Sequence, residues 1–268
     1  IDNKIILNQT FNQAADPTGG GLFIGGQTAL PGTVTAGTGN VSVDRNLIQY
    51  NHAGAGAGGG VSIARTTNNQ NVVLTNNMIV NNAAAYAGGG VAVANVFANV
   101  RLVNNTVADN ASTATNRQSF PAGPKVQSTA QIAGIALVSG ARPTLLNNIV
   151  WGNKSFTWSI NRTTLPETTR LTDAGLWDLG IVGNPSHTAL ASTNSLLSAG
   201  SSPVNCTNCQ IADVTQVGFV RPIGFTWQTD PDQPTVLPET TIMQTALTFD
   251  EGGNFINVLF SPLTPWDI

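Results

Sequence analysis

The stretch Val72-Val-Leu-Thr-Asn-Asn77-Met-Ile-Val-Asn-Asn82 decides the fold, because close copies of it recur along the chain. The copies are Val41-Ser-Val-Asp-Arg-Asn46-Leu-Ile-Gln-Tyr-Asn51, Val100-Arg-Leu-Val-Asn-Asn105-Thr-Val-Ala-Asp-Asn110 and Pro143-Thr-Leu-Leu-Asn-Asn148-Ile-Val-Trp-Gly-Asn153. Degenerate copies are expected at 6–13 and 191–197. The Asn residues at positions 46, 77, 105 and 148 are 31, 28 and 43 residues apart, and spacings of this size are typical of repeat architectures.

A second phrase, rich in glycine, alternates with the first. It reads Gly19-Gly-Gly-Leu-Phe-Ile24, Gly58-Gly-Gly-Val-Ser-Ile63 and Gly88-Gly-Gly-Val-Ala-Val93, and it recurs more weakly at 133–137 and 175–179. Each repeat therefore holds two or three short strand-like segments and no helical period. Because a unit this short cannot bury its own apolar face, it must stack on its neighbours. The sequence predicts the coils of a β-solenoid.

Alignment of the copies predicts which side chains stack on one another. One apolar column holds Ile48, Ile79, Val107 and Val150, and Leu74, Leu102 and Leu145 approximate another. A third column, at a corner, holds Asn51, Asn82, Asn110 and Asn153. Stacked amides can hydrogen-bond along such a column, and Asn tolerates the left-handed backbone of a sharp turn. We expect a structural Asn ladder at this corner.

The composition excludes several classes of protein. Only 9% of the 268 residues are charged, whereas about a quarter is usual for a soluble domain. The polar residues are instead dominated by uncharged types, with 29 Asn beside 28 Gly. A net charge of -3 with few basic residues offers no surface for nucleic acid. No apolar run reaches the roughly 18 residues of a membrane helix, so we expect neither nucleic acid as a partner nor a membrane-spanning segment.

The phrases Leu146-Asn-Asn-Ile-Val-Trp-Gly-Asn153 and Val103-Asn-Asn-Thr-Val-Ala-Asp-Asn110, together with the Gly-Gly-Gly-Val phrases, carry a family resemblance. The chain resembles the right-handed parallel β-helix repeat proteins of the pectate-lyase-like superfamily, of the kind found in large bacterial secreted and surface proteins. The resemblance implies an all-β fold, a right-handed parallel β-helix of about five to six coils, and a secreted or cell-surface location.

The same resemblance suggests how the chain is divided. We expect the parallel β-helix to occupy residues 1–204 and an irregular, β-rich C-terminal cap packed on the solenoid to occupy residues 205–268. The segment Phe249-Asp-Glu-Gly-Gly-Asn-Phe-Ile-Asn-Val-Leu-Phe-Ser-Pro-Leu263 is similar to one that follows such helices in very large surface proteins. We therefore expect the chain to be excised from a longer precursor.

Catalytic candidates are few. Enzymes of the resembling fold that cleave acidic polysaccharides use clustered Asp residues with a Lys or Arg base. Asp44 and Asp109 lie on different coils and at different positions of the repeat, so they form no evident pair. Hydrolysis of a glycoside needs two carboxylates about 5 to 10 Å apart. If the chain is an enzyme, Asp44, Arg45, Arg101 and Asp109 are the residues to test. Otherwise the two Asp residues are solvated corner residues and Arg45 caps the Asn stack.

Breaks in the repeat locate two insertions, 117–129 and 154–173. Loops that project from one side of a solenoid commonly carry binding surfaces. The second insertion contains Trp158, Arg162 and Arg170, which are candidates for contact with a glycan, although aromatic residues more often fill a core.

The motif Cys206-Thr-Asn-Cys209 has a spacing shared by redox, zinc and haem sites. Gln210 stands where haem attachment needs His, and no second Cys pair completes a zinc site. We expect a local disulfide between Cys206 and Cys209, which presumes an oxidising compartment. His52 and His187 have no companion ligands, so neither a metal nor a cofactor is expected.

Together these observations favour a structural role. We expect a non-enzymatic extracellular module that assembles with copies of itself, or with other surface proteins, into a filament, sheath or surface layer. The alternative is a polysaccharide lyase or hydrolase, or a carbohydrate-binding β-helix, because one fold hosts many functions.

Overall fold

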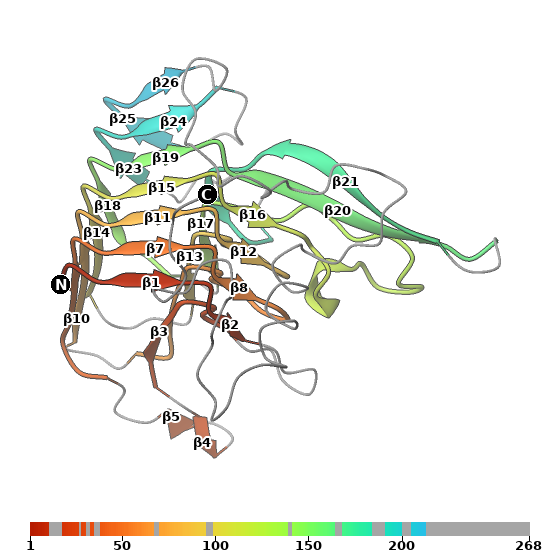
Figure 1. Cartoon of the computed structure of the whole chain (residues 1–268), viewed down its shortest axis with the longest axis horizontal. Coiled ribbons are helices and arrows are strands. Elements are labelled where there is room, and N and C mark those ends of the chain that lie inside the picture. The colour runs from red at the N-terminus through yellow and green to blue at the C-terminus, as the bar shows by residue number, and fades with distance from the viewer. Residues whose placement is uncertain are drawn as a thin grey trace, which may run out of the picture.

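The chain folds as a parallel β-helix, in which short strands wind into coils that stack on one another (Figure 1). The computed structural model describes residues 1–10, 18–26, 28–30, 33–34, 38–66, 70–94, 99–138, 141–163, 168–183, 191–199 and 205–212. Within this part of the chain the only helix is one 3-10 turn, Arg117–Ser119. The complete coils pass through four sheets in a fixed order, here named sheets 1 to 4.

Every strand of the coils pairs in parallel with its equivalents in the neighbouring coils. Sheet 1 contains β6 (Val41–Asp44), β10 (Asn71–Thr75), β14 (Asn99–Val103), β18 (Thr144–Leu146), β23 (Ala191–Thr193) and β25 (Asn205–Thr207). Sheet 2 contains β1 (Lys4–Ile6), β7 (Leu47–Gln49), β11 (Met78–Val80), β15 (Thr106–Ala108), β19 (Ile149–Trp151), β24 (Leu196–Ser198) and β26 (Gln210–Ala212).

The other two sheets complete each coil. Sheet 3 contains β2 (Gln9–Thr10), β8 (His52–Ala53), β12 (Ala83–Ala84), β16 (Ala111–Ser112) and β20 (Lys154–Asn161), to which β21 (Thr168–Leu176) pairs antiparallel. Sheet 4 contains β3 (Leu22–Gly25), β9 (Val61–Ala64), β13 (Val91–Ala94), β17 (Ile135–Val138) and β22 (Leu179–Ile181). A separate antiparallel pair, β4 (Thr28–Leu30) and β5 (Thr33–Val34), stands outside the coils.

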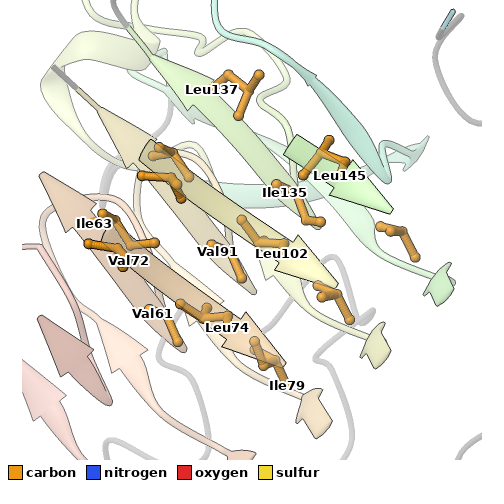
Figure 2. Packing of buried hydrophobic residues seen from close by; sticks show 14 of the residues in the cluster. Val61, Ile63, Val72, Leu74, Ile79, Val91, Leu102, Ile135, Leu137 and Leu145 are labelled. Carbon is orange, nitrogen blue, oxygen red and sulfur yellow. The ribbon is translucent and has the colours of Figure 1, made fainter. Parts of the chain in front are cut away.

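The core is a set of apolar columns inside the coils (Figure 2). Ile48, Ile79, Val107 and Val150 are in register across sheet 2, and Leu74, Leu102 and Leu145 are in register across sheet 1, which confirms both columns predicted from the repeat. All of these side chains are buried. Stacking of equivalent residues is what lets a coil with no core of its own become stable.

Two corners of each coil use the same two-residue turn. At the first corner, between sheets 1 and 2, residues such as Arg45, Asn76 and Asn104 have a φ of 55° to 57°. At the second corner, between sheets 2 and 3, Tyr50 and Asn81 have a φ of 56° and 55°. Left-handed backbone favours Asn and Gly, which explains why the repeat is rich in them.

The ends of the stack differ in two ways from the sequence prediction. The predicted N-terminal copy at 6–13 is wrong, because Ile5 pairs with Ile48 and the copy therefore ends at Asn8. This first coil has no described strand in sheet 1, so the apolar run that guided the alignment is missing. After residue 204, β25 and β26 still add strands to sheets 1 and 2, and the rest of the expected cap, 213–268, lies outside the described residues.

Candidate functional site

Two ladders of amides run along the stack, one at each corner, and their members are buried except for the exposed first ones, Asn3 and Asn8. The first holds Asn3, Asn46, Asn77, Asn105 and Asn148 and ends at Ser195; the second holds Asn8, Asn51, Asn82, Asn110 and Asn153 and ends at Asp178. In each step the backbone N–H and the Nδ2 of one Asn both donate to Oδ1 of the Asn in the next coil, at 2.9 to 3.2 Å. In every Asn-to-Asn step the donors belong to the coil nearer the N-terminus and the accepting Oδ1 to the next coil, so both ladders are polar. The same Nδ2 groups also donate to backbone carbonyls of the preceding coil.

Asp178 ends the second ladder and fixes the coil that follows. Its Oδ1 accepts from the backbone N–H of Asn153 at 3.1 Å and from Asn153 Nδ2 at 2.9 Å. Its Oδ2 accepts from the backbone N–H of Ser198 at 2.8 Å. The side chain is fully buried, and this desolvation raises the pKa of the carboxyl group. Sequence reasoning did not assign Asp178 a role; the available signal was its place directly before Leu179, where earlier coils have glycine.

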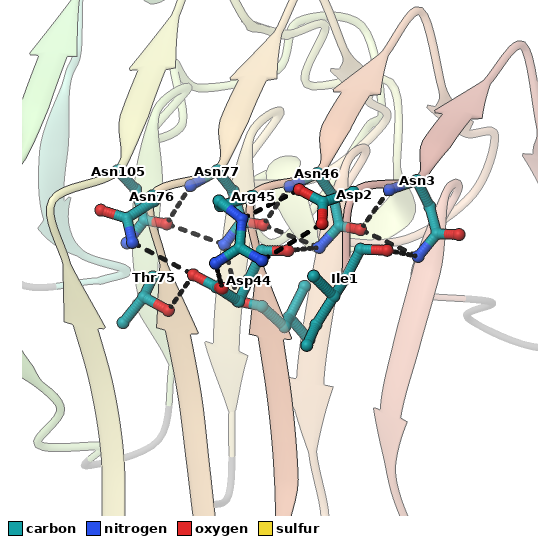
Figure 3. A network of polar contacts seen from close by, with 11 residues as sticks. Ile1, Asp2, Asn3, Asp44, Arg45, Asn46, Thr75, Asn76, Asn77 and Asn105 are labelled. Carbon is teal, nitrogen blue, oxygen red and sulfur yellow. Dashed lines mark hydrogen bonds and ion pairs between the residues drawn. The ribbon is translucent and has the colours of Figure 1, made fainter.

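The candidates Asp44 and Arg45 belong to an exposed polar network beside the first ladder (Figure 3). Arg45 donates from Nε to Asp2 Oδ1 at 2.9 Å and also contacts Asp44. Asp44 Oδ1 accepts from Thr75 Oγ1 at 2.7 Å and from Asn76 Nδ2 at 3.1 Å. The hydrogen bonds from Thr75 and Asn76 lower the pKa of Asp44, so it is ionised and engaged at neutral pH. This network connects three coils, so Asp44 and Arg45 both have a structural role.

The structure does not bring the remaining catalytic candidates to Asp44. Asp109 has a φ of 52° and stands at the second corner, two coils from Asp44 and across the width of sheet 2. Two coil steps and a three-residue strand each correspond to about 10 Å and run at right angles, so together they separate the two residues by about 14 Å, more than the spacing of a paired-carboxylate site. Arg101 is exposed on the outer face of sheet 1, in register with Val73 and Thr144. Among the described residues these four side chains form no common site.

The candidate glycan residues lie on or beside a long hairpin formed by β20 and β21, which projects from the stack (Figure 1). Trp158 is half-buried, packed edge-on against Phe120 with ring centroids 5.6 Å apart. Its backbone also bonds to Ser128, so the two predicted insertions pack on each other. Arg162 and Arg170 are exposed, but Arg170 pairs with Ser159 and thus lies on the opposite hairpin face from Trp158.

The two cysteines lie in the last described coil. Cys206 is in β25, and Cys209 occupies the turn position that follows the left-handed Asn208, equivalent to the Asn and Ser195 positions of the first ladder. The disulfide between them stays a prediction. Mass spectrometry that counts free thiols in freshly isolated protein tests it, because two free thiols would contradict the disulfide.

His52 is a buried histidine in sheet 3. Gln9 Nε2 lies 3.2 Å from His52 Nδ1, and because an amide nitrogen can only donate, Nδ1 accepts and the ring is neutral. Burial lowers the pKa of His52 to about 4 from 6.5. The side chain therefore resists protonation in the folded state.

This burial predicts a pH-dependent loss of stability. A depressed folded-state pKa means that the unfolded chain binds the proton first, so stability is present above pH 6.5 and is lost as the pH falls towards 4. At about 1.4 kcal/mol per unit, we expect His52 to reduce the free energy of unfolding by about 3 kcal/mol across that window. Urea unfolding at pH 7 and pH 4 measures it. His52→Gln is the control, since other groups, Asp178 included, act equally in both proteins; an unchanged pH dependence in that variant contradicts the prediction.

The described residues contain no group of three or more His, Cys, Asp and Glu side chains that could hold a metal ion. They likewise contain no helix long and apolar enough to cross a membrane. What the fold offers is an all-β stack with polar ladders and, among the described residues, end strands that pair on one side only. Comparison with protein-family models, with curated proteins and with solved structures finds no match for this chain.

Proposed function

We propose that this chain is a non-enzymatic, extracellular structural or adhesive module of the pectate-lyase-like superfamily that assembles with copies of itself. The observation that carries the proposal is how its acidic and basic candidates are used. Asp44 and Arg45 connect neighbouring coils, Asp178 ends a ladder, and Asp109 and Arg101 stand apart. A catalytic site requires such groups to converge on one substrate.

The ends of the stack support assembly. Among the described residues β1, β3 and β6 each pair on one side only, and so do β25 and β26 at the other end. A strand that pairs on one side presents backbone N–H and C=O groups to another chain. The chain carries only 11 basic and 14 acidic side chains, so copies repel each other weakly.

Sedimentation over a range of concentrations, followed by electron microscopy, tests this proposal. We expect oligomers that grow with concentration and are reduced by Lys4→Pro, because Lys4 is exposed on the edge strand β1 and proline removes a backbone donor there. Lys4→Ala is the matched control, since it keeps the backbone N–H. A chain that stays monomeric at every concentration, with no assembled form in its native source, overturns the proposal.

The second candidate function is action on, or binding of, a polysaccharide. The outward polar face of the hairpin favours it, because the pairs Thr157–Thr172 and Ser159–Arg170 place hydroxyl groups beside an exposed guanidinium. A glycan panel separates the possibilities. Release of unsaturated or reducing ends indicates a lyase or hydrolase, and binding without release that is lost in Arg170→Ala indicates a carbohydrate-binding module.

A further inference from the structure

The outer side of sheet 2 carries a buried apolar cluster. Val80, Ala108 and Trp151 are in register in one column and are 3%, 0% and 2% exposed. They alternate with the core residues Ile79, Val107 and Val150, so their side chains point away from the solenoid interior. Residues on the outside of a stack are ordinarily in contact with water. Another part of the molecule therefore covers these three side chains.

Comparable clusters on the neighbouring sheets have an identified cover. On sheet 3, Ala83 and Ala111 pack against Phe156 and Leu171 of the hairpin. On sheet 4, Ala136 packs with Ile132 and Trp177, which lie outside the strands of that sheet. The sheet 2 cluster differs, because the further described hydrophobic residues against it are Leu47 and Leu196, both of sheet 2 itself. No described hydrophobic residue outside sheet 2 therefore covers this cluster.

The adjoining second corner shows the same shielding. Asn81 has a φ of 55°, like the first-corner residues Asn76, Asn104 and Asn147, which are all exposed. Asn81 is instead 1% exposed, and neither its Nδ2 nor its Oδ1 has a hydrogen-bond partner among the described residues. A buried amide without partners costs about 1 to 3 kcal/mol per group. A polypeptide backbone laid over this corner offers both a donor and an acceptor for this amide.

We propose that residues 213–268 of this same chain lie over this patch, formed by Val80, Asn81, Ala108 and Trp151. The chain arrives beside it, since Ala212 ends β26 opposite Ser198 in sheet 2, along the row of Trp151. The patch lies two to four coil steps away, about 10 to 19 Å, which about six extended residues can span. The 56 residues after Ala212 (268 minus 212) are therefore ample.

The composition of this segment fits an apolar site. Residues 213–268 contain seven of the 17 aromatic residues of the chain and a single basic residue, Arg221. A segment with this many large apolar side chains gains by burying them. Packing on the side of the stack also leaves the strand edges at its ends open. This inference does not rest on the proposed assembly, because it concerns one chain and a different surface.

Photo-crosslinking tests the proposal. Met78 is 45% exposed in the same strand as Val80, so p-benzoylphenylalanine placed there lies at the margin of the patch. The same group at Arg101, exposed on sheet 1, is the control position. Mixed isotope-labelled and unlabelled full chains are irradiated and mapped by mass spectrometry. We expect crosslinks from position 78 to 213–268 within one chain and none from position 101.

Two results overturn the proposal: no crosslink from position 78 to 213–268, or crosslinks that join labelled to unlabelled chains, which identify a second copy as the cover. Limited proteolysis provides an independent measurement. Val80→Asp places a charge under the cover, so we expect cleavage within 213–268 to become at least about tenfold faster. Met78→Asp is the matched control and should leave the cleavage rate unchanged; equal rates in both variants contradict the proposal.

Discussion

Replacing Gly89 by Ala is expected to lower the free energy of unfolding by at least about 3 kcal/mol. A Cβ atom at Gly89 would lie 2.1 Å from the carbonyl oxygen of Ala111 and 2.6 Å from its backbone carbon and nitrogen. These are main-chain atoms of the next coil, so no side-chain rotation relieves the contact. Gly20 and Gly59 occupy the equivalent position in two other coils, with nearest atoms at 2.4 and 2.2 Å.

Urea unfolding followed by circular dichroism measures this effect. Gly175→Ala is the control, because Gly175 has a φ of +91° but no atom within 4 Å of an added Cβ. That variant meets only the cost of left-handed backbone, about 1 to 2 kcal/mol. If the two variants unfold at similar urea concentrations, close approach of the coils is not the reason for glycine at position 89.

Much of the fold could be predicted because each copy of the repeat has apolar residues at the same positions. Ile48, Ile79 and Val107 recur at a constant offset from the Asn residues, so alignment of the phrases is also alignment of the strands. The N-terminal coil was misplaced for the same reason, since it has no described strand in sheet 1 and Asn8 could align with either Asn of the phrase. Where the period is intact, sequence determines register.

The polar contacts depend on which parts of the chain meet in three dimensions, and the spacing of the repeat does not show this. Asp178 directly precedes β22 of sheet 4 yet accepts from Asn153 at the second corner, because pairing of Lys154 with Leu176 in the β20–β21 hairpin brings the two segments together. The first ladder escaped prediction because Asn46 and Asn77 were treated only as markers of the repeat. Trp158 was read as a candidate binding residue because the sequence does not show that Phe120, 38 positions earlier, packs against it.

Asn82→Ala is expected to lower the free energy of unfolding by about 3 to 5 kcal/mol, the sum of two or three buried hydrogen bonds left without a partner. Asn82 is fully buried, and its Oδ1 accepts from the backbone N–H and the Nδ2 of Asn51, each at 2.9 Å. Its Nδ2 donates to the carbonyl oxygen of Ile48 at 2.9 Å and to Asn110 Oδ1 at 3.0 Å. Alanine supplies neither the acceptor nor the donor.

Two further variants separate the ladder from a general sensitivity of the corners. Asn147→Gly should change the free energy of unfolding by no more than about 0.5 kcal/mol, because Asn147 is exposed and glycine adopts its φ of 54° freely. Asn82→Asp keeps an acceptor for Asn51 but turns a second oxygen towards the carbonyl of Ile48, so it should be destabilised at pH 7 and partly recover when acid protonates the carboxylate. If the donors and acceptors of the ladder have fixed directions, Asn147→Gly should have nearly the same free energy of unfolding as the parent. Both Asn82 variants should have a much lower free energy of unfolding at neutral pH. An Asn82→Asp protein as stable as the parent at pH 7 contradicts a ladder in which donor and acceptor have fixed directions.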